Sequence, residues 1–129
     1  MTILPYRVLP FVLACAALMG CRSDAPPDVV TRQYLEAGSR GDLDAARKLV
    51  VPRCHDKDEG RVEAIQFEGV PIKIEKLQIH VTRSSDTAAT VRYEIAGSAK
   101  DRGGSDALAA KGGDLRLEKV DGVWLVSCE

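Results

Sequence analysis

The chain has 129 residues, of which 18 are Lys or Arg and 19 are Asp or Glu, so its formal net charge is −1 at pH 7. This length fits one domain with a short additional segment. The nearly balanced charge gives no support for a nucleic-acid partner, and no polybasic run is present that would attract an anionic membrane.

The first residues have the pattern of an export signal. An apolar run over residues 8–18 follows a single positive charge at Arg7, and a small residue, Gly20, stands directly before Cys21. The run is shorter than the roughly 20 residues that a membrane-spanning helix needs, and it contains Pro10. A transmembrane anchor and a conventional secretory signal are the alternatives to a signal that ends at the cysteine.

The stretch Leu18-Met19-Gly20-Cys21 resembles the lipobox of bacterial lipoproteins. In that family the cysteine thiol receives a diacylglycerol, the preceding peptide is removed and the new amine is usually acylated. The resemblance implies a signal peptide over residues 1–20, lipid on Cys21, a lipidated cysteine and linker over residues 21–27, and a domain over residues 28–129. Several acyl chains suffice for stable membrane anchoring. Arg22 stands where enteric inner-membrane lipoproteins often carry Asp, which favours the periplasmic face of the outer membrane in the cell envelope.

The cysteine count predicts a disulfide. Cys15 would leave with the signal peptide and Cys21 would carry lipid, which leaves Cys54 and Cys128 in an exported chain. Disulfides form and persist outside the cytoplasm, so we predict a bridge between these two residues. Two buried free thiols are the alternative. A metal site has less support, because neither cysteine belongs to a CxxC pair and only two histidines could join them.

Helical spacing of apolar residues predicts two helices after the linker. The first is expected to begin with Asp28 as its N-cap and to present an apolar side before residues 38–41 end it. Asp42 is expected to cap the second, which continues over residues 43–50 until Pro52 stops it. A short third helix is expected within residues 58–67.

After Gly69 the apolar residues alternate with a period of two, which predicts strands. The first strand covers residues 70–82, with a bulge where the alternation slips at Glu75 and Lys76. A turn over residues 84–86 leads to the second strand, residues 89–95. The glycine-rich residues 101–113 are interpreted as a long mobile connection or a broken edge strand, with residues 107–110 briefly paired. A third strand carries Leu115 and Leu117, and the hairpin signal Asp121-Gly122 leads to a last strand with Trp124, Val126 and Cys128 on one face.

Helices followed by hairpin-linked strands predict an α+β fold with a mostly antiparallel, four-stranded sheet. Two motifs add a resemblance. Residues 29–46, with Arg40-Gly41-Asp42-Leu43, and the ending Leu115-x-Leu117-x-Lys119-x-Asp121-Gly122-x-Trp124 look like the start and the final hairpin of nuclear transport factor 2-like domains. The resemblance implies two or three N-terminal helices packed on a strongly bent sheet, which together form a cone.

Strand parity and helical spacing place seven side chains where they would line or fill this cone. They are Tyr34, Leu35, Ile79, Ala89, Val91, Tyr93 and Trp124. No catalytic residue, metal ligand or cofactor is assigned. His55 lies in a polar segment, and His80 has the parity of an outward-facing residue.

The leading interpretation is a membrane-anchored, non-catalytic domain that binds a small apolar molecule or lipid in the cone, or an envelope protein on its sheet. One alternative is an enzyme of the isomerase or dehydratase kind that uses a buried Tyr or Asp. Another is a structural accessory subunit of an envelope complex. A buried carboxylate in an open cone would favour the enzyme. A filled cone with a broad exposed apolar sheet would favour the interaction protein, and a closed cone with a polar sheet would leave no assigned activity.

Overall fold

A computed structural model describes residues 25–63, 65, 70–100 and 103–128 of the chain. The signal peptide predicted over residues 1–20 and the lipid predicted on Cys21 lie outside these residues. The helices come first and the strands follow: α2 (Pro27–Ser39), α3 (Leu43–Arg47), the 3-10 helix η2 (Pro52–Cys54), α4 (His55–Glu63), β1 (Lys73–Ser84), β2 (Ala88–Lys100), β3 (Asp106–Val120) and β4 (Val123–Ser127). The predicted α+β class is confirmed.

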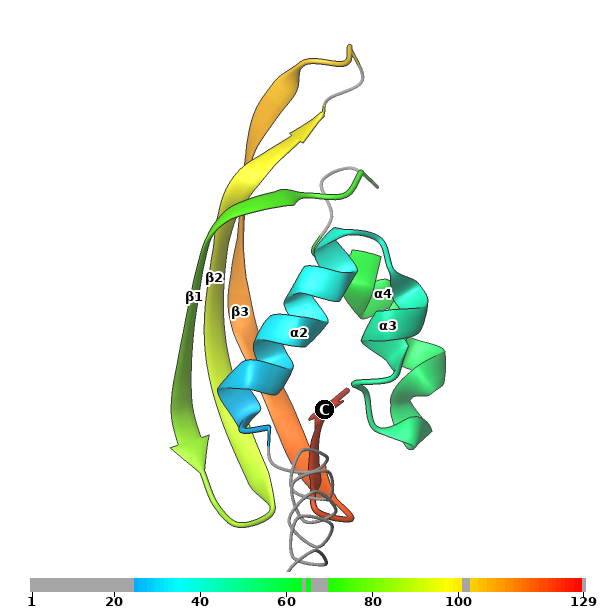
Figure 1. Cartoon of the computed structure of the whole chain (residues 1–129), viewed down its shortest axis with the longest axis vertical. Coiled ribbons are helices and arrows are strands. Elements are labelled where there is room, and N and C mark those ends of the chain that lie inside the picture. The colour runs from blue at the N-terminus through cyan, green and yellow to red at the C-terminus, as the bar shows by residue number, and fades with distance from the viewer. Residues whose placement is uncertain (1–24, 64, 66–69, 101–102, 129) are drawn as a thin grey trace, which may run out of the picture.

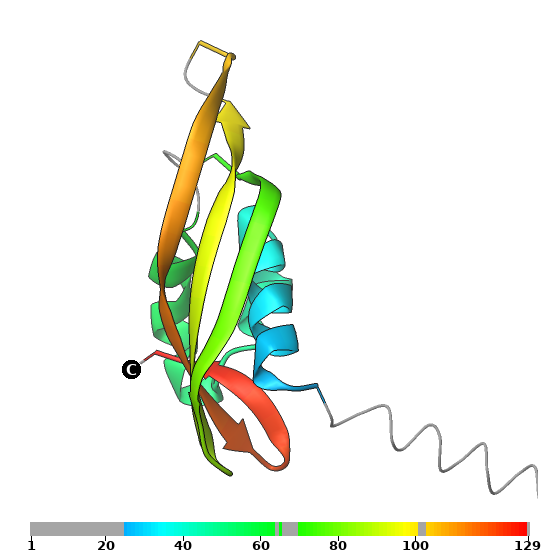
Figure 2. The ribbon, with the colours of Figure 1, turned by 90° about the vertical axis from the view of Figure 1, so that its left-hand side faces the viewer.

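The four strands form one curved antiparallel sheet in the order β1-β2-β3-β4. Helix α2 lies against the inner face of this sheet, and α3 and α4 lie beyond it (Figure 1). Turned by 90°, the strands stand in front of the described helices (Figure 2). The helices therefore cover one face of the sheet, and the opposite face, called the outer face below, is open.

The core lies between α2 and the inner face. Helix α2 buries one apolar side, on which Tyr34 and Leu35 are fully buried, and β2 contributes Val91 and Ile95. The alternation along β2 is strict, because Thr90 and Arg92 face outward between these buried residues. The parity predicted for β2 is thus confirmed.

Two irregularities interrupt the pairing of β1 with β2. The register shifts between Ile74 and Lys76, where the sequence predicts a bulge, and again between Val81 and Arg83, where it predicts none. Gly97 lies at the first irregularity. A Cβ atom added there would stand 2.0 Å from the Lys73 carbonyl oxygen, so only glycine fits this close approach.

The last hairpin forms as predicted. Asp121 and Gly122 have φ angles of 51° and 82°, and the two flanking valines, Val120 and Val123, pair across the turn. Two consecutive residues with positive φ match the twist of the strands that they connect.

The helix boundaries differ from the prediction at both ends of the helical region. Pro26, in an extended conformation, is the N-cap of α2, and Asp28 lies in the first turn rather than at the cap. Pro27 can start the helix because its φ is already helical and its missing N–H is not needed there. Helix α4 starts at His55, directly after η2, and not at residue 58. The end of the predicted third helix, residues 66–67, lies outside the described residues.

The second predicted helix is shorter than expected, because the residues after it join the sheet. Helix α3 ends at Arg47, whereas Asp42 caps it as predicted by accepting a hydrogen bond from the Ala45 N–H. The Val51 N–H donates to the Val126 carbonyl, and the Val126 N–H donates to the Leu49 carbonyl, at 2.9 and 2.7 Å. This parallel contact with β4 outweighs the local helical spacing.

The brief pairing predicted for residues 107–110 is confirmed, but the break expected after them is wrong, because residues 111–113 continue the same strand. Strand β3 runs without a break from Asp106 to Val120 and pairs with β2 from Lys100↔Asp106 to Ala88↔Glu118. Backbone pairing along a long neighbour holds Gly112 and Gly113 in the strand despite the weak strand preference of glycine.

Candidate functional site

The seven residues predicted to line or fill the cone come together, but they pack against one another. Five of them are buried in one hydrophobic core, and Ile79 and Tyr93 are partly buried at its margin; the five are Tyr34, Leu35, Ala89, Val91 and Trp124. The inner face is therefore filled in the part of the chain that the structure describes. Close packing of this kind leaves no room for a ligand at these positions.

The filled core holds no buried carboxylate among the described residues. Its buried polar side chains are Thr31, Ser39 and Ser127. The Thr31 hydroxyl donates to the Pro27 carbonyl at 2.8 Å, and the Ser39 hydroxyl donates to the Glu36 carbonyl at 2.9 Å, both within α2. These hydroxyls satisfy their own helix and do not form an acid–base site.

Tyr93 is the one predicted cone residue with a partly exposed polar group. Its ring lies across Gly113, where an added Cβ atom would stand 3.5 Å from the phenolic oxygen. Burial raises the pKa of Tyr93 because it disfavours the phenolate, and the charge of Arg61 opposes this shift. The hydroxyl is therefore protonated at neutral pH. Tyr34, by contrast, is fully buried and cannot reach a ligand.

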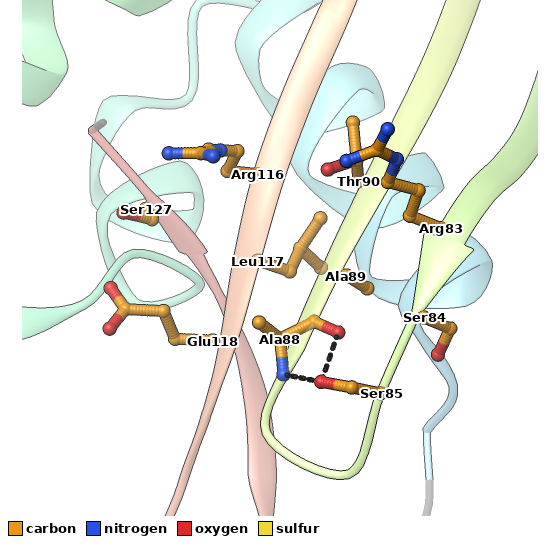
Figure 3. A pocket seen from close by; sticks show the side chains of 10 residues that line it. All are labelled: Arg83, Ser84, Ser85, Ala88, Ala89, Thr90, Arg116, Leu117, Glu118 and Ser127. Carbon is orange, nitrogen blue, oxygen red and sulfur yellow. Dashed lines mark hydrogen bonds between the residues drawn. The ribbon is translucent and has the colours of Figure 1, made fainter.

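A groove lies on the outer face, near the end of the sheet that carries the β1–β2 turn. Its volume is about 670 Å³. Its lining comes from the ends of all four strands and from this turn: Arg83, Ser84, Ser85, Ala88, Ala89, Thr90, Arg116, Leu117, Glu118 and Ser127 (Figure 3). Of the seven predicted cone residues, only Ala89 belongs to this set, and its side chain is 4% exposed.

The strand register aligns three outward-facing residues across the groove. Thr90 of β2 pairs with Arg83 of β1 on one side and with Arg116 of β3 on the other. Directly paired residues project from the same face of a sheet, so the two arginines leave the sheet on either side of Thr90. We call Arg83, Thr90 and Arg116 the arginine row.

A compact turn positions one end of the row. The Ser85 N–H donates to the Ala88 carbonyl at 2.8 Å, and the Ser85 hydroxyl oxygen accepts from the N–H groups of Ala88 and Thr87 at 3.2 and 3.4 Å. This serine turn closes the β1–β2 hairpin directly after Arg83 and Ser84. The end of the groove is thus built on a hydrogen-bonded turn (Figure 3).

The acidic residues around the row already have cationic partners. Glu118 forms an ion pair with Arg53 of η2, and this hydrogen bond, followed by one from Ser127, lowers the pKa of the Glu118 carboxyl. Asp114 pairs with Arg92 at 3.0 Å, and this carboxylate raises the pKa of Arg92. Within the described chain, neither Arg83 nor Arg116 takes part in an ion pair.

The predicted disulfide is present. Cys54, at the end of η2, is joined to Cys128, directly after β4, with a Cα–Cα distance of 5.6 Å. The bridge fastens η2 to the last strand, and η2 supplies Arg53 to Glu118 on the outer face. Among the described residues, no group of three or more His, Cys, Asp or Glu side chains is arranged to hold a metal ion.

Solved structures with the same architecture identify the fold. A ketosteroid isomerase-like protein from Erwinia carotovora atroseptica superposes with a TM-score of 0.60 at 19% identity, covering 75% of this chain and 85% of the other. A putative NTF2-like transpeptidase from Campylobacter jejuni gives a TM-score of 0.56 at 12% identity, over 81% of this chain and all of the other. The domain has the nuclear transport factor 2-like fold.

At such low identity the likeness concerns the fold of this nuclear transport factor 2-like domain and not its activity. An NTF2-like protein with a cystatin-like fold from Novosphingobium aromaticivorans adds a further match, with a TM-score of 0.50 at 12% identity over 95% of this chain and 87% of the other. No family model and no curated protein match the sequence.

A second cavity lies where the nuclear transport factor 2-like domain begins. It joins the residues before and at the start of α2 to the tips of two hairpins: Ala25, Pro26, Pro27, Ser84, Lys119, Asp121, Gly122 and Trp124. The Lys119 ammonium lies 5.7 Å from the centre of the Trp124 ring, within the range of a cation–π contact. Ser84 lines both cavities, so the groove is adjacent to this end of the domain.

Sequence reasoning did not find the groove. Parity places Arg116 on the outer face, since it stands between the inward-facing Leu115 and Leu117. Parity gives Arg83 the inward direction of Ile79 and Val81, and only the irregularity between Val81 and Arg83 turns it outward. Which outward residues become neighbours depends on the register, and the irregularity between Val81 and Arg83 sets it.

Proposed function

We propose that the chain is a lipoprotein of the bacterial envelope, anchored through lipid on Cys21 at the periplasmic face of the outer membrane. Its nuclear transport factor 2-like domain acts as a non-catalytic binding module. The observation that carries the binding role is the placement of free space: the inner face is filled by core side chains, and the groove lies on the open outer face.

The enzyme alternative has less support. A general acid or base needs an ionisable group in a site that a substrate can enter. Tyr34 is sealed in the core, and the buried polar side chains of the described residues include no Asp or Glu. Tyr93 has a partly exposed hydroxyl, but none of the interactions described above places a second acid or base beside it.

The nature of the outer face also changes the expected ligand. The large apolar residues of the described chain that are exposed are scattered, and they are Val29, Leu43, Val81, Leu108 and Val123. The groove is lined by arginine, serine, threonine and glutamate side chains as well as alanine and leucine. A polar or charged ligand fits this lining better than the apolar ligand expected in a cone.

The anchor is tested by replacing Cys21 with Ser. The variant should lose lipid and appear in the soluble fraction, because no helix among the described residues is long and apolar enough to span a membrane. Fractionation after an alkaline wash measures this. A variant that stays wholly in the membrane fraction would show that lipid on Cys21 is not the anchor.

The binding role is tested in the living cell by a photo-crosslinking amino acid in place of Thr90, which lines the groove. His80, exposed on the same outer face but outside the groove, is the matched control position. We expect a discrete adduct from position 90 and none from position 80. Equal labelling from both positions, or none from either, would argue against a binding groove.

A further inference from the structure

We propose that the arginine row is a binding site for a phosphate group, and that its occupant is the headgroup phosphate of the membrane lipids beside the anchor. The phosphate chemistry follows from the row itself. The lipid source rests on the proposed anchor at Cys21, and the experiment below separates the two.

The geometry suits a tetrahedral anion. Neighbouring strands lie about 4.8 Å apart, so Arg83 and Arg116, which flank Thr90, are about 10 Å apart at the backbone. Arginine side chains are long enough to meet between such positions, and their planar N–H groups match phosphate oxygens in pairs. The Thr90 hydroxyl adds a neutral donor between them.

For both arginines to contact one phosphate, the Arg116 side chain must change its conformation. In Figure 3 the Arg83 side chain extends from β1 in the direction of Thr90, whereas the Arg116 side chain is directed toward the β4 side of the groove. Arg116 is an exposed residue without an ion pair in the described chain, and such side chains change rotamer within nanoseconds. An anion over Thr90 would draw both guanidinium groups together.

The charges around the row favour an anion from outside the domain. The carboxylate in the groove, Glu118, accepts hydrogen bonds from Arg53 and Ser127, and Asp114 is paired with Arg92. Asp86, in the β1–β2 turn, does not line the groove. Neither arginine of the row is thus paired with a carboxylate of the described residues, and an anion from outside could balance their charge.

The position of the groove favours a lipid as the source of that phosphate. Ser84 lines both the groove and the second cavity, and that cavity also contains Ala25. Ala25 follows Cys21 by four residues, which span at most about 14 Å when fully extended. A lipid on Cys21 would therefore hold this end of the domain close to the headgroups.

The test measures how fast each arginine reacts with phenylglyoxal, read by peptide mass spectrometry on the full lipidated protein. One sample is in neutral detergent without phosphate, one is in the same detergent with inorganic phosphate, and one is in vesicles of phosphatidylethanolamine and phosphatidylglycerol. We expect Arg83 and Arg116 to be protected by inorganic phosphate and in vesicles. Arg92 is the internal control. It lies on the outer face, two residues beyond Thr90 along β2, and it already forms an ion pair with Asp114.

Substitutions separate a specific site from general attraction. Arg83→Gln should weaken phosphate protection of Arg116 roughly tenfold, because it removes charge-assisted hydrogen bonds. Arg92→Gln removes the same charge nearby and should leave the protection of both residues unchanged. Equal loss in both variants would overturn the site in favour of a diffuse field.

The other outcomes distinguish the source of the phosphate and test the site itself. Protection by inorganic phosphate without protection in vesicles would overturn the lipid source and assign the row to a soluble phosphate compound. No protection in any sample would overturn the proposal. Flotation of the same vesicles measures membrane attachment independently. A protein that floats while its arginines stay unprotected contradicts this proposal only. A protein that does not float contradicts the anchor.

Discussion

At the scale of single residues, the chemistry of the outer face depends on which charges are already paired. Glu118 accepts from Arg53, and Asp114 accepts from Arg92, so these carboxylates do not neutralise the arginine row. Burial raises the pKa of Tyr93, so its hydroxyl is a neutral hydrogen-bonding group. The distribution of partners, more than the net charge of −1, sets what each face can bind.

Glu118→Gln gives a prediction about pH. Arg53 lowers the folded-state pKa of Glu118 below its ordinary value of 4.5, so the pair stabilises the fold fully above that pH, and the stabilisation is lost as pH falls through the folded pKa. We expect the variant to unfold more easily at pH 7 by less than about 1 kcal/mol, since the Arg53 side chain is about half exposed. Urea unfolding between pH 7 and 3 measures this.

The same titration supplies its control. Arg53→Gln should show a similar deficit at pH 7, and the double variant should cost little more than either single one. A deficit of Glu118→Gln that persists unchanged at pH 3 would mean that packing, and not the ion pair, is lost.

At the scale of elements, one segment connects the helices to the sheet. Residues 49–51 pair with β4, η2 follows them, and the disulfide returns from η2 to the residue after β4. The His55 ring nitrogen Nε2 lies 3.2 Å from the Val50 carbonyl oxygen, which ties the start of α4 to the same segment. The end of the helical region is therefore held to β4 by backbone pairing and by a covalent bond.

We predict that removal of the disulfide destabilises the domain. Cys54 and Cys128 are 74 positions apart, and for a loop of that length the chain-entropy model gives about 4.5 kcal/mol. We expect Cys54→Ala with Cys128→Ala to lower the free energy of unfolding by about 2–4.5 kcal/mol, because measured values often fall below the model. Urea unfolding of the oxidised parent and the double variant provides the comparison.

Direct chemistry checks the bridge itself. Peptide mapping without reduction should recover the two cysteines as a linked pair. Complete alkylation of both thiols in protein freshly isolated from the envelope, without added reductant, would contradict it.

At the scale of the whole molecule, the two ends of the long strands differ. One end gathers the start of α2, the β1–β2 turn and the β3–β4 hairpin around the second cavity. At the other end the β2–β3 hairpin extends beyond the helices (Figure 1). Leu108, near that tip, is 90% exposed. An anchor at Cys21 would place the first end at the membrane and the tip away from it.

This orientation is a prediction for fluorescent labels attached at single positions of the lipidated protein in vesicles. Ser84→Cys marks the first end and Leu108→Cys marks the tip. Ser84 is level with Leu117 across the sheet, so nine strand residues, or roughly 30 Å, separate the two positions along β3. We expect a quencher carried by lipid headgroups to quench the label at position 84 strongly and the label at position 108 little. The reverse order would place the tip at the membrane.

Much of this fold follows from the sequence alone, because several of its signals are local. Asp121-Gly122 accepts the positive φ angles of its turn, Asp42 caps the helix that follows it, and alternating residues assign each strand an inner and an outer face. The cysteine count selected the bridge that is found among the described residues. Each of these inferences depends on a few neighbouring residues or on composition.

The tertiary structure decided the features that depend on distant backbone partners. Residues 49–51 are not helical, although their spacing predicts a helix, because they pair with the edge of β4. Gly112 and Gly113 belong to β3 because both pair with β2. The same holds for the groove: parity sends Thr90 and Arg116 outward, but only the irregularity after Val81 turns Arg83 outward and sets the three residues in one row. Pairing between strands is a long-range choice, and no local pattern encodes it.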